Sequence, residues 1–66
     1  MLKFEDVKKG DLLGLVNRKM HIIVVLEQPK RMGHSYFADI MWLSDQKYVK
    51  EYCFFKSDED RWFKLC

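Results

Sequence analysis

Apolar and polar residues follow one another along this chain in short runs that predict strands separated by polar turns. Residues 10–27 read GDLLGLVNRKMHIIVVLE, in which two branched apolar runs flank the polar NRK. Such a density of β-branched side chains favours strands over helices, so we expect strands over residues 12–17 and about 20–28. Pro29 cannot donate a hydrogen bond to a neighbouring strand, and the second strand should stop there.

The second half of the chain continues this pattern. We expect residues 29–35, PKRMGHS, to form a loop with Gly33 as its flexible point. The run SYFADIMWLS predicts a third strand, and KYVKEYCFF at about 47–55 predicts a fourth after a tight turn. In this fourth strand the two alternating sets of side chains compete for the inside, so its orientation stays open.

Segments near the two ends complete the predicted domain. Phe4 and Val7 in the segment 2–9 should pack on the core, although this segment is too short for a stable helix. Residues 57–60, SDED, form an acidic turn that also has the composition of a helix start, with a Ser cap followed by carboxylates. Only a few residues follow, and we place a short fifth strand at 62–65.

Five short strands joined by tight polar turns predict an all-β fold. We expect residues 1–66 to form one domain, a strongly bent five-stranded small barrel with room for one short helical turn before the last strand. An open sheet of four or five strands with a helical turn is the alternative. Closure is favoured because an open sheet this apolar would expose adhesive edges.

The second strand raises the question of what covers its two faces. Ile22, Val24 and Leu26 fall on one face, and Ile23 and Val25 fall on the other. Aromatic residues make up 15% of the chain, more than a barrel of this size can bury. Either the bent chain covers both faces itself, or a partner covers one of them, and we expect a partner protein or a second copy.

Composition narrows the classes of partner. The net charge of +2 is too even to require nucleic acid as a partner, because dedicated nucleic-acid binders usually concentrate positive charge on one face. No apolar run approaches the roughly 20 residues that span a membrane, so we expect no membrane partner. With only two cysteines, Cys53 and Cys66, and no apolar leader, we expect an intracellular protein with reduced thiols, in which Cys53 is a buried small residue.

Chemistry-bearing residues do not combine into a recognisable reactive site. There is no phosphate-cradling glycine loop, no nucleophile with a supporting base and no paired-carboxylate arrangement. His21, His34, Cys53 and Cys66 lack the paired spacing of zinc ligands. A barrel of this length also lacks room for a deep pocket. We therefore expect no enzyme activity, no cofactor, no metal and no small-molecule substrate.

The order of residues resembles a known group of small barrels. The run VKKGDLLGLV, a turn, an apolar strand ending VVLE, and then IMWLSDQKYVKEY resembles domains of the Src-homology-3-like type over about residues 7–55. The nearest variants are KOW-like and Tudor-like domains and short barrel proteins encoded by bacteriophages. Two departures are clear: KOW-like domains usually carry a glycine where this chain has Ile22-Ile23, and no complete aromatic cage of the Tudor-like kind can be matched.

This resemblance and the aromatic surplus lead to two hypotheses of function. The first is a non-catalytic protein-interaction module; the resemblance implies a phage-encoded virion component or a modulator of a host protein, located in the host cytoplasm or the virion. The alternative is a nucleic-acid-binding barrel that uses basic turns and stacked aromatics, with Arg18, Lys19 and Lys47 clustered at one end to hold a phosphate. The candidate residues of the protein interface are Met20, Ile23, Val25, Tyr36, Trp42 and Tyr48.

Overall fold

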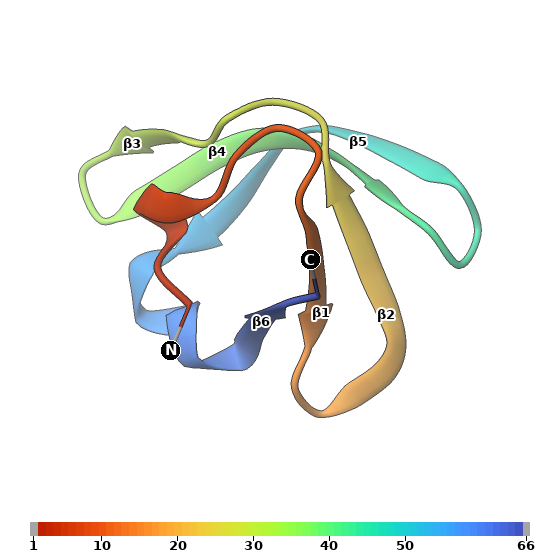
Figure 1. Ribbon diagram of the computed structural model, residues 1–66. Coiled ribbons are helices and arrows are strands. Elements are labelled where there is room, and N and C mark those ends of the chain that lie inside the picture. Colours follow the sequence, from red (N-terminus) through yellow and green to blue (C-terminus); the bar gives the residue numbers. More distant parts are fainter. Residues whose placement is uncertain (1, 66) are drawn as a thin grey trace.

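The protein is an all-β domain built from one curled antiparallel sheet that forms a half-barrel (Figure 1). The computed structural model describes residues 2–65, and of residues 18–20 it describes the backbone alone. The strand order is β3-β4-β2-β1-β6, with β5 on the other side of β4. The elements are η1 (Phe4–Asp6), β1 (Leu12–Leu15), β2 (Arg18–Val25), β3 (Lys30–Met32), β4 (Ser35–Trp42), β5 (Lys47–Phe55), η2 (Lys56–Arg61) and β6 (Trp62–Lys64).

The structure confirms the all-β fold class and corrects the strand count. The predicted loop at 29–35 contains a sixth strand, β3, which pairs with the first residues of β4. The preceding strand ends at Val25, four residues before Pro29, and not at Pro29 as predicted. Met32 and Ser35 pair across a two-residue turn whose first residue, Gly33, has φ 66. Hairpin turns of this length favour glycine at such a position, so the turn residues close a hairpin instead of a loop.

A β-bulge in β5 resolves the ambiguous alternation of the fourth predicted strand. Ala38 pairs with Tyr52 and Ile40 pairs with Val49, so that Asp39 alone faces the two residues 50–51. The extra residue shifts the alternation by one position. As a result Val49 lies on the inner face before the bulge, and Tyr52 and Phe54 lie on it afterwards.

The core fills the inner face of the half-barrel. Phe4 and Val7 are buried there, as predicted from the sequence. The backbone N–H of Phe4 donates to Oε2 of Glu59 at 2.7 Å, which ties η1 to η2. The predicted helical turn exists as the 3-10 turn η2, but Phe55 occupies its N-cap position, not Ser57, and makes no side-chain cap. The buried apolar residues are Phe4, Val7, Leu13, Ile23, Val25, Tyr36, Ala38, Ile40, Phe54 and Trp62.

Among the described side chains, seven aromatic contacts connect much of this core. Phe54 lies near its centre, with its ring 5.0 Å from that of Phe4 and 5.5 Å from that of Trp62. Trp42 extends the chain of rings toward Tyr52 at 6.1 Å and His21 at 6.0 Å. Pairs at such spacings add stabilisation beyond their buried area. Six of the ten aromatic rings therefore lie on the inner face, and the exposed rings are those of Tyr48, Phe55 and Phe63.

The two faces of β2 have different surroundings. Ile23 and Val25 point inward and are completely buried, whereas Ile22, Val24 and Leu26 are half-buried on the outer face. The chain thus covers one apolar face of this strand by itself. Of residues 2–65, no helix is long and apolar enough to span a membrane.

Candidate binding surface on the outer face

Apolar side chains form a row across the outer face of the sheet. Strand register places Leu12 opposite Val24, Val24 opposite Met41, and Met41 opposite Tyr48. The backbone N–H of Leu65 donates to the carbonyl of Leu12, which extends the row beyond β6. Paired residues point to the same face of a sheet, so the side chains stand side by side. We call this set the outer row: Leu65, Leu12, Val24, Met41 and Tyr48.

A second line of apolar side chains runs beside the outer row. Gly14 pairs with Phe63 on one side and with Ile22 on the other. The backbone N–H of Leu43 donates a hydrogen bond to the carbonyl of Ile22, which places Leu43 next in this line. The ring of Phe63 lies over Gly14, where a Cβ would come within 2.8 Å of it. Glycine therefore leaves space for the ring, which remains 40% exposed. Together the two lines give an apolar surface that crosses most of the sheet.

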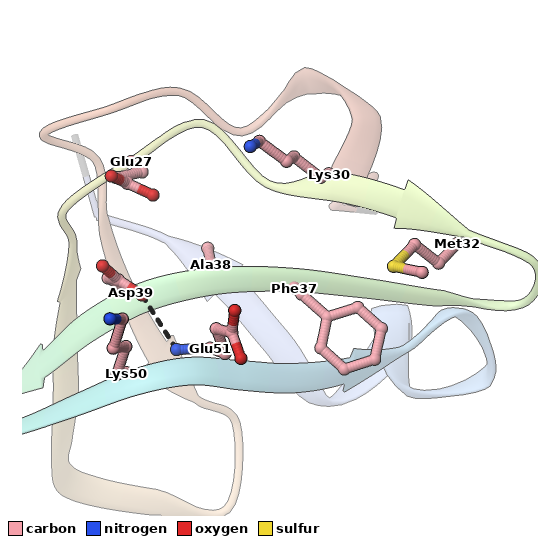
Figure 2. Close-up of a pocket in the computed structure, with 8 residues that line it drawn as sticks. All are labelled: Glu27, Lys30, Met32, Phe37, Ala38, Asp39, Lys50 and Glu51. Carbon is pink, nitrogen blue, oxygen red and sulfur yellow. Dashed lines mark hydrogen bonds between the residues drawn. The ribbon is translucent and has the colours of Figure 1, made fainter.

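A pocket of about 470 Å³ opens on the same face at the β-bulge (Figure 2). Its lining combines charged groups on β4, β5 and the segment before β3 with an aromatic ring and a thioether. Its volume falls within the range of ligand pockets. It is nonetheless an open surface hollow. We call it the bulge pocket; its lining residues are Glu27, Lys30, Met32, Phe37, Ala38, Asp39, Lys50 and Glu51.

The carboxylate of Asp39 holds the centre of the bulge. Oδ1 accepts a hydrogen bond from the backbone N–H of Glu51 at 2.8 Å, and Oδ2 accepts one from the Tyr48 hydroxyl at 2.9 Å. These bonds, with the nearby ammonium groups of Lys50 and Lys30, lower the pKa of Asp39. The same bond raises the pKa of Tyr48, since ionising its hydroxyl would remove the donor. The bulge pocket therefore contains a carboxylate that stays ionised.

Four of the six predicted interface residues lie on the inner face of the sheet. Ile23 and Val25 are fully buried and Tyr36 is 2% exposed, all on the inner face. Trp42 is half-buried and packs inward against its aromatic neighbours, so it offers a partner little surface. The register of the strands places these four side chains in the core. The sequence left this open because both faces of these strands are apolar.

Of the remaining candidates, Tyr48 is 55% exposed and belongs to the outer row. The side chain of Met20 lies outside the described part of the chain. The six candidates do not include the other members of the outer row, which are Leu12, Val24, Met41 and Leu65. In residues 21–26, HIIVVL, both sets of alternate side chains are apolar, so the sequence does not indicate which set faces outward. Cys53, predicted to be buried, is half-buried beside Phe37 on the outer face.

The basic candidates for nucleic-acid binding are only partly described. Lys47 is exposed at the start of β5, and the side chains of Arg18 and Lys19 lie outside the described residues. The hairpins that carry them leave the sheet at the same end, because Ile23 on β2 pairs with Trp42 on β4 in antiparallel register. They nevertheless turn in different directions (Figure 1). A shared phosphate site therefore stays a prediction.

Within residues 2–65, no group of three or more His, Cys, Asp or Glu side chains is arranged to hold a metal ion. At the level of fold, the curled sheet is compatible with a small β-barrel. No protein-family model, curated protein or solved structure matches this chain.

Proposed function

We propose that this chain is a non-catalytic protein-binding module whose outer row contacts an apolar surface of another protein. The observation that supports this is the continuity of the row: five apolar side chains stand side by side from Leu65 to Tyr48 on one face of the sheet. Soluble monomeric proteins rarely expose large contiguous apolar patches, and such patches mark interaction sites.

The composition of this surface favours a protein partner. Aromatic residues and methionine are enriched in protein interfaces, and the outer row with its neighbour contains Tyr48, Phe63 and Met41. Tyr48 and Phe63 are 55% and 40% exposed, so both have area left to bury. Charged residues are absent from the row itself, which lowers the desolvation cost of covering it.

The finer part of the proposal comes from the resemblance of residues 7–55 to Src-homology-3-like barrels. On that basis the module is a small barrel protein encoded by a bacteriophage, and its partner is a virion protein or a host protein in the cytoplasm. A second copy of the chain is the other candidate occupant. Contact with the outer row is common to all of these partners.

Solution mass measured by light scattering is the first experiment, across protein concentration and with reductant present. A double variant, Tyr48→Lys with Leu65→Lys, places charges at the two ends of the outer row, where both side chains are exposed. Val16→Lys is the matched control, because Val16 is an exposed apolar residue at the β1–β2 turn, outside the row. If the protein self-associates, the double variant should be monomeric and the control should not.

If the protein is monomeric, a photocrosslinking side chain at position 48 identifies the partner in a host or virion extract. We expect adducts that excess unlabelled protein competes away, and that are absent when the same group stands at position 16. The proposal is overturned if the double variant self-associates as the wild type does. It is also overturned if the protein neither self-associates nor forms adducts at position 48.

A further inference from the structure

The bulge pocket has one charged end and one apolar end. Figure 2 shows Asp39, Lys50 and Glu27 together at one end, and Phe37 and Met32 at the other, with Glu51 between them. Phe37 and Met32 stand on neighbouring strands, β4 and β3, and Met32 is 68% exposed. The pocket therefore presents apolar walls that lead toward a group of charges.

Negative charge predominates in this lining. Three carboxylates, from Glu27, Asp39 and Glu51, face two ammonium groups, from Lys30 and Lys50. Among the described side chains, none of these five groups has an ion-pair partner within 4.0 Å; the pairs that form join Arg61 to Asp58 and Lys64 to Asp11, elsewhere. Carboxylates without a paired cation at the edge of an apolar hollow favour a cationic group from outside.

The arrangement of apolar and charged groups in the bulge pocket is complementary to an arginine side chain. Arginine has an apolar stem ended by a planar cation that pairs with carboxylates through two parallel hydrogen bonds and stacks on aromatic faces. Its stem would lie along Met32 and Phe37, and its guanidinium would reach Glu27 and Glu51. Asp39 contributes charge, although two of its acceptor positions are already occupied by the Glu51 N–H and the Tyr48 hydroxyl.

We propose that the bulge pocket receives an arginine side chain of the partner protein, beside the contact made by the outer row. Tyr48 links the two surfaces, because it belongs to the outer row and its hydroxyl bonds to Asp39 in the pocket. The inference rests on the proposed function, since the arginine comes from the same partner. An acidic side chain would be drawn to Lys30 and Lys50 but would have to enter beside three carboxylates.

Short blocked peptides test the pocket without knowledge of the partner. The probe is acetyl-Leu-Arg-Leu-amide; acetyl-Leu-citrulline-Leu-amide has nearly the same shape without the charge, and acetyl-Leu-Glu-Leu-amide reverses it. Titration is followed by the amide signals of Phe37, Asp39 and Glu51 in proton–nitrogen NMR spectra. We expect saturable shifts with the arginine peptide and binding about tenfold weaker with citrulline, the change given by loss of a charge-assisted hydrogen bond.

A double variant, Glu27→Gln with Glu51→Gln, removes two carboxylates. Both side chains are exposed, and Glu51 contributes its backbone N–H to the bulge, so the fold should be retained. Glu5→Gln, an exposed carboxylate in η1, is the matched control. We expect the double variant to weaken arginine binding about tenfold and the control to leave it unchanged.

The proposal is overturned if the arginine peptide causes no shifts at these amides, if citrulline binds equally well, or if the glutamate peptide binds more tightly. The double variant also separates this inference from the proposed function. If it keeps the position-48 adducts or the self-association but does not differ from wild type toward the peptides, the outer row is an interface and the arginine site is wrong.

Discussion

The backbone N–H of Glu51 donates a hydrogen bond to Oδ1 of Asp39 at 2.8 Å, across the point where β5 has one residue more than β4. Glu51 has φ 55, in the left-handed region that side chains other than glycine rarely adopt. This bond therefore holds a strained residue in place. The bulge determines which side chains of β5 face inward. The half-buried carboxylate of Asp39 on the outer face therefore supports the placement of Tyr52 and Phe54 in the core.

Replacing Glu51 with glycine should stabilise the protein. Glycine adopts a positive φ without a steric penalty, whereas other residues pay about 1 kcal/mol or more in this region. We expect Glu51→Gly to raise the free energy of unfolding by about 1 kcal/mol, measured by urea denaturation. Glu51→Ala is the control, because it removes the same carboxylate and keeps the strain. A glycine variant no more stable than the alanine variant would contradict the strained conformation.

The bond to Asp39 should also make stability depend on pH. The pKa of Asp39 is lowered in the folded protein, first by the hydrogen bond from Glu51 and then by the one from Tyr48. A carboxyl whose pKa is depressed by folding contributes stability above its unfolded pKa, and this contribution is lost as the pH falls through its folded pKa. We expect the loss below about pH 4, the ordinary range of an aspartate.

Comparison with Asp39→Asn isolates this contribution. The variant keeps a side-chain oxygen for the Glu51 N–H but does not titrate. The urea midpoint should therefore fall less steeply below about pH 4 in the variant than in the wild type. Parallel pH profiles would show that Asp39 does not carry the dependence.

The sequence predicted most of the strands because each has a local signal. β-branched density marked β2, and the burial of Phe4 and Val7 followed from apolar residues in an otherwise polar segment. The strand β3 was missed because Lys30, Arg31 and Met32 are exposed and have no alternating pattern. These residues pair because the turn at Gly33 brings them beside the strand β4. The pattern of three residues alone does not indicate such a pairing.

The candidate surface was harder to predict because it depends on which way each strand faces. In β2 both sets of alternate side chains are apolar, so local sequence does not distinguish Ile23 from Val24. In β5 a bulge reverses the alternation at Glu51, a residue type with no preference for a positive φ. The bulge pocket is formed by that bulge together with residues of β3. The sequence predicted neither the bulge nor β3, so it could not predict the pocket.

The hydrogen bond between η1 and η2 should contribute measurably to stability. The N–H of Phe4 donates to Oε2 of Glu59, and the two residues are separated by 55 positions in the sequence. Hydrogen bonds to charged groups are worth about 1.5–3 kcal/mol, and the partial exposure of Glu59 places this bond near the lower end of that range. We expect Glu59→Ala to lower the free energy of unfolding by about that amount, and Asp60→Ala, an exposed neighbour, to leave it nearly unchanged. Equal effects of the two substitutions would contradict the role of this bond.

The hydroxyl of Tyr36 is buried and finds no hydrogen-bond partner among the described residues. Its ring packs 5.7 Å from that of Phe4, so the aromatic part of the side chain contributes to the core while the hydroxyl opposes folding. A buried polar group without a partner costs about 1–3 kcal/mol, because it has left water and gained nothing in exchange. Removing the hydroxyl alone should therefore help.

We expect Tyr36→Phe to raise the free energy of unfolding by about 1 kcal/mol, the lower end of that cost, since the space left by one oxygen is small. Tyr48→Phe is the matched control: it removes an exposed hydroxyl that donates to Asp39, and it should not stabilise the protein. Urea denaturation of both variants beside the wild type measures the difference. If Tyr36→Phe instead destabilises the protein, the hydroxyl has a partner in solution, and a buried water molecule reached from the inner face becomes the explanation for keeping tyrosine at this position.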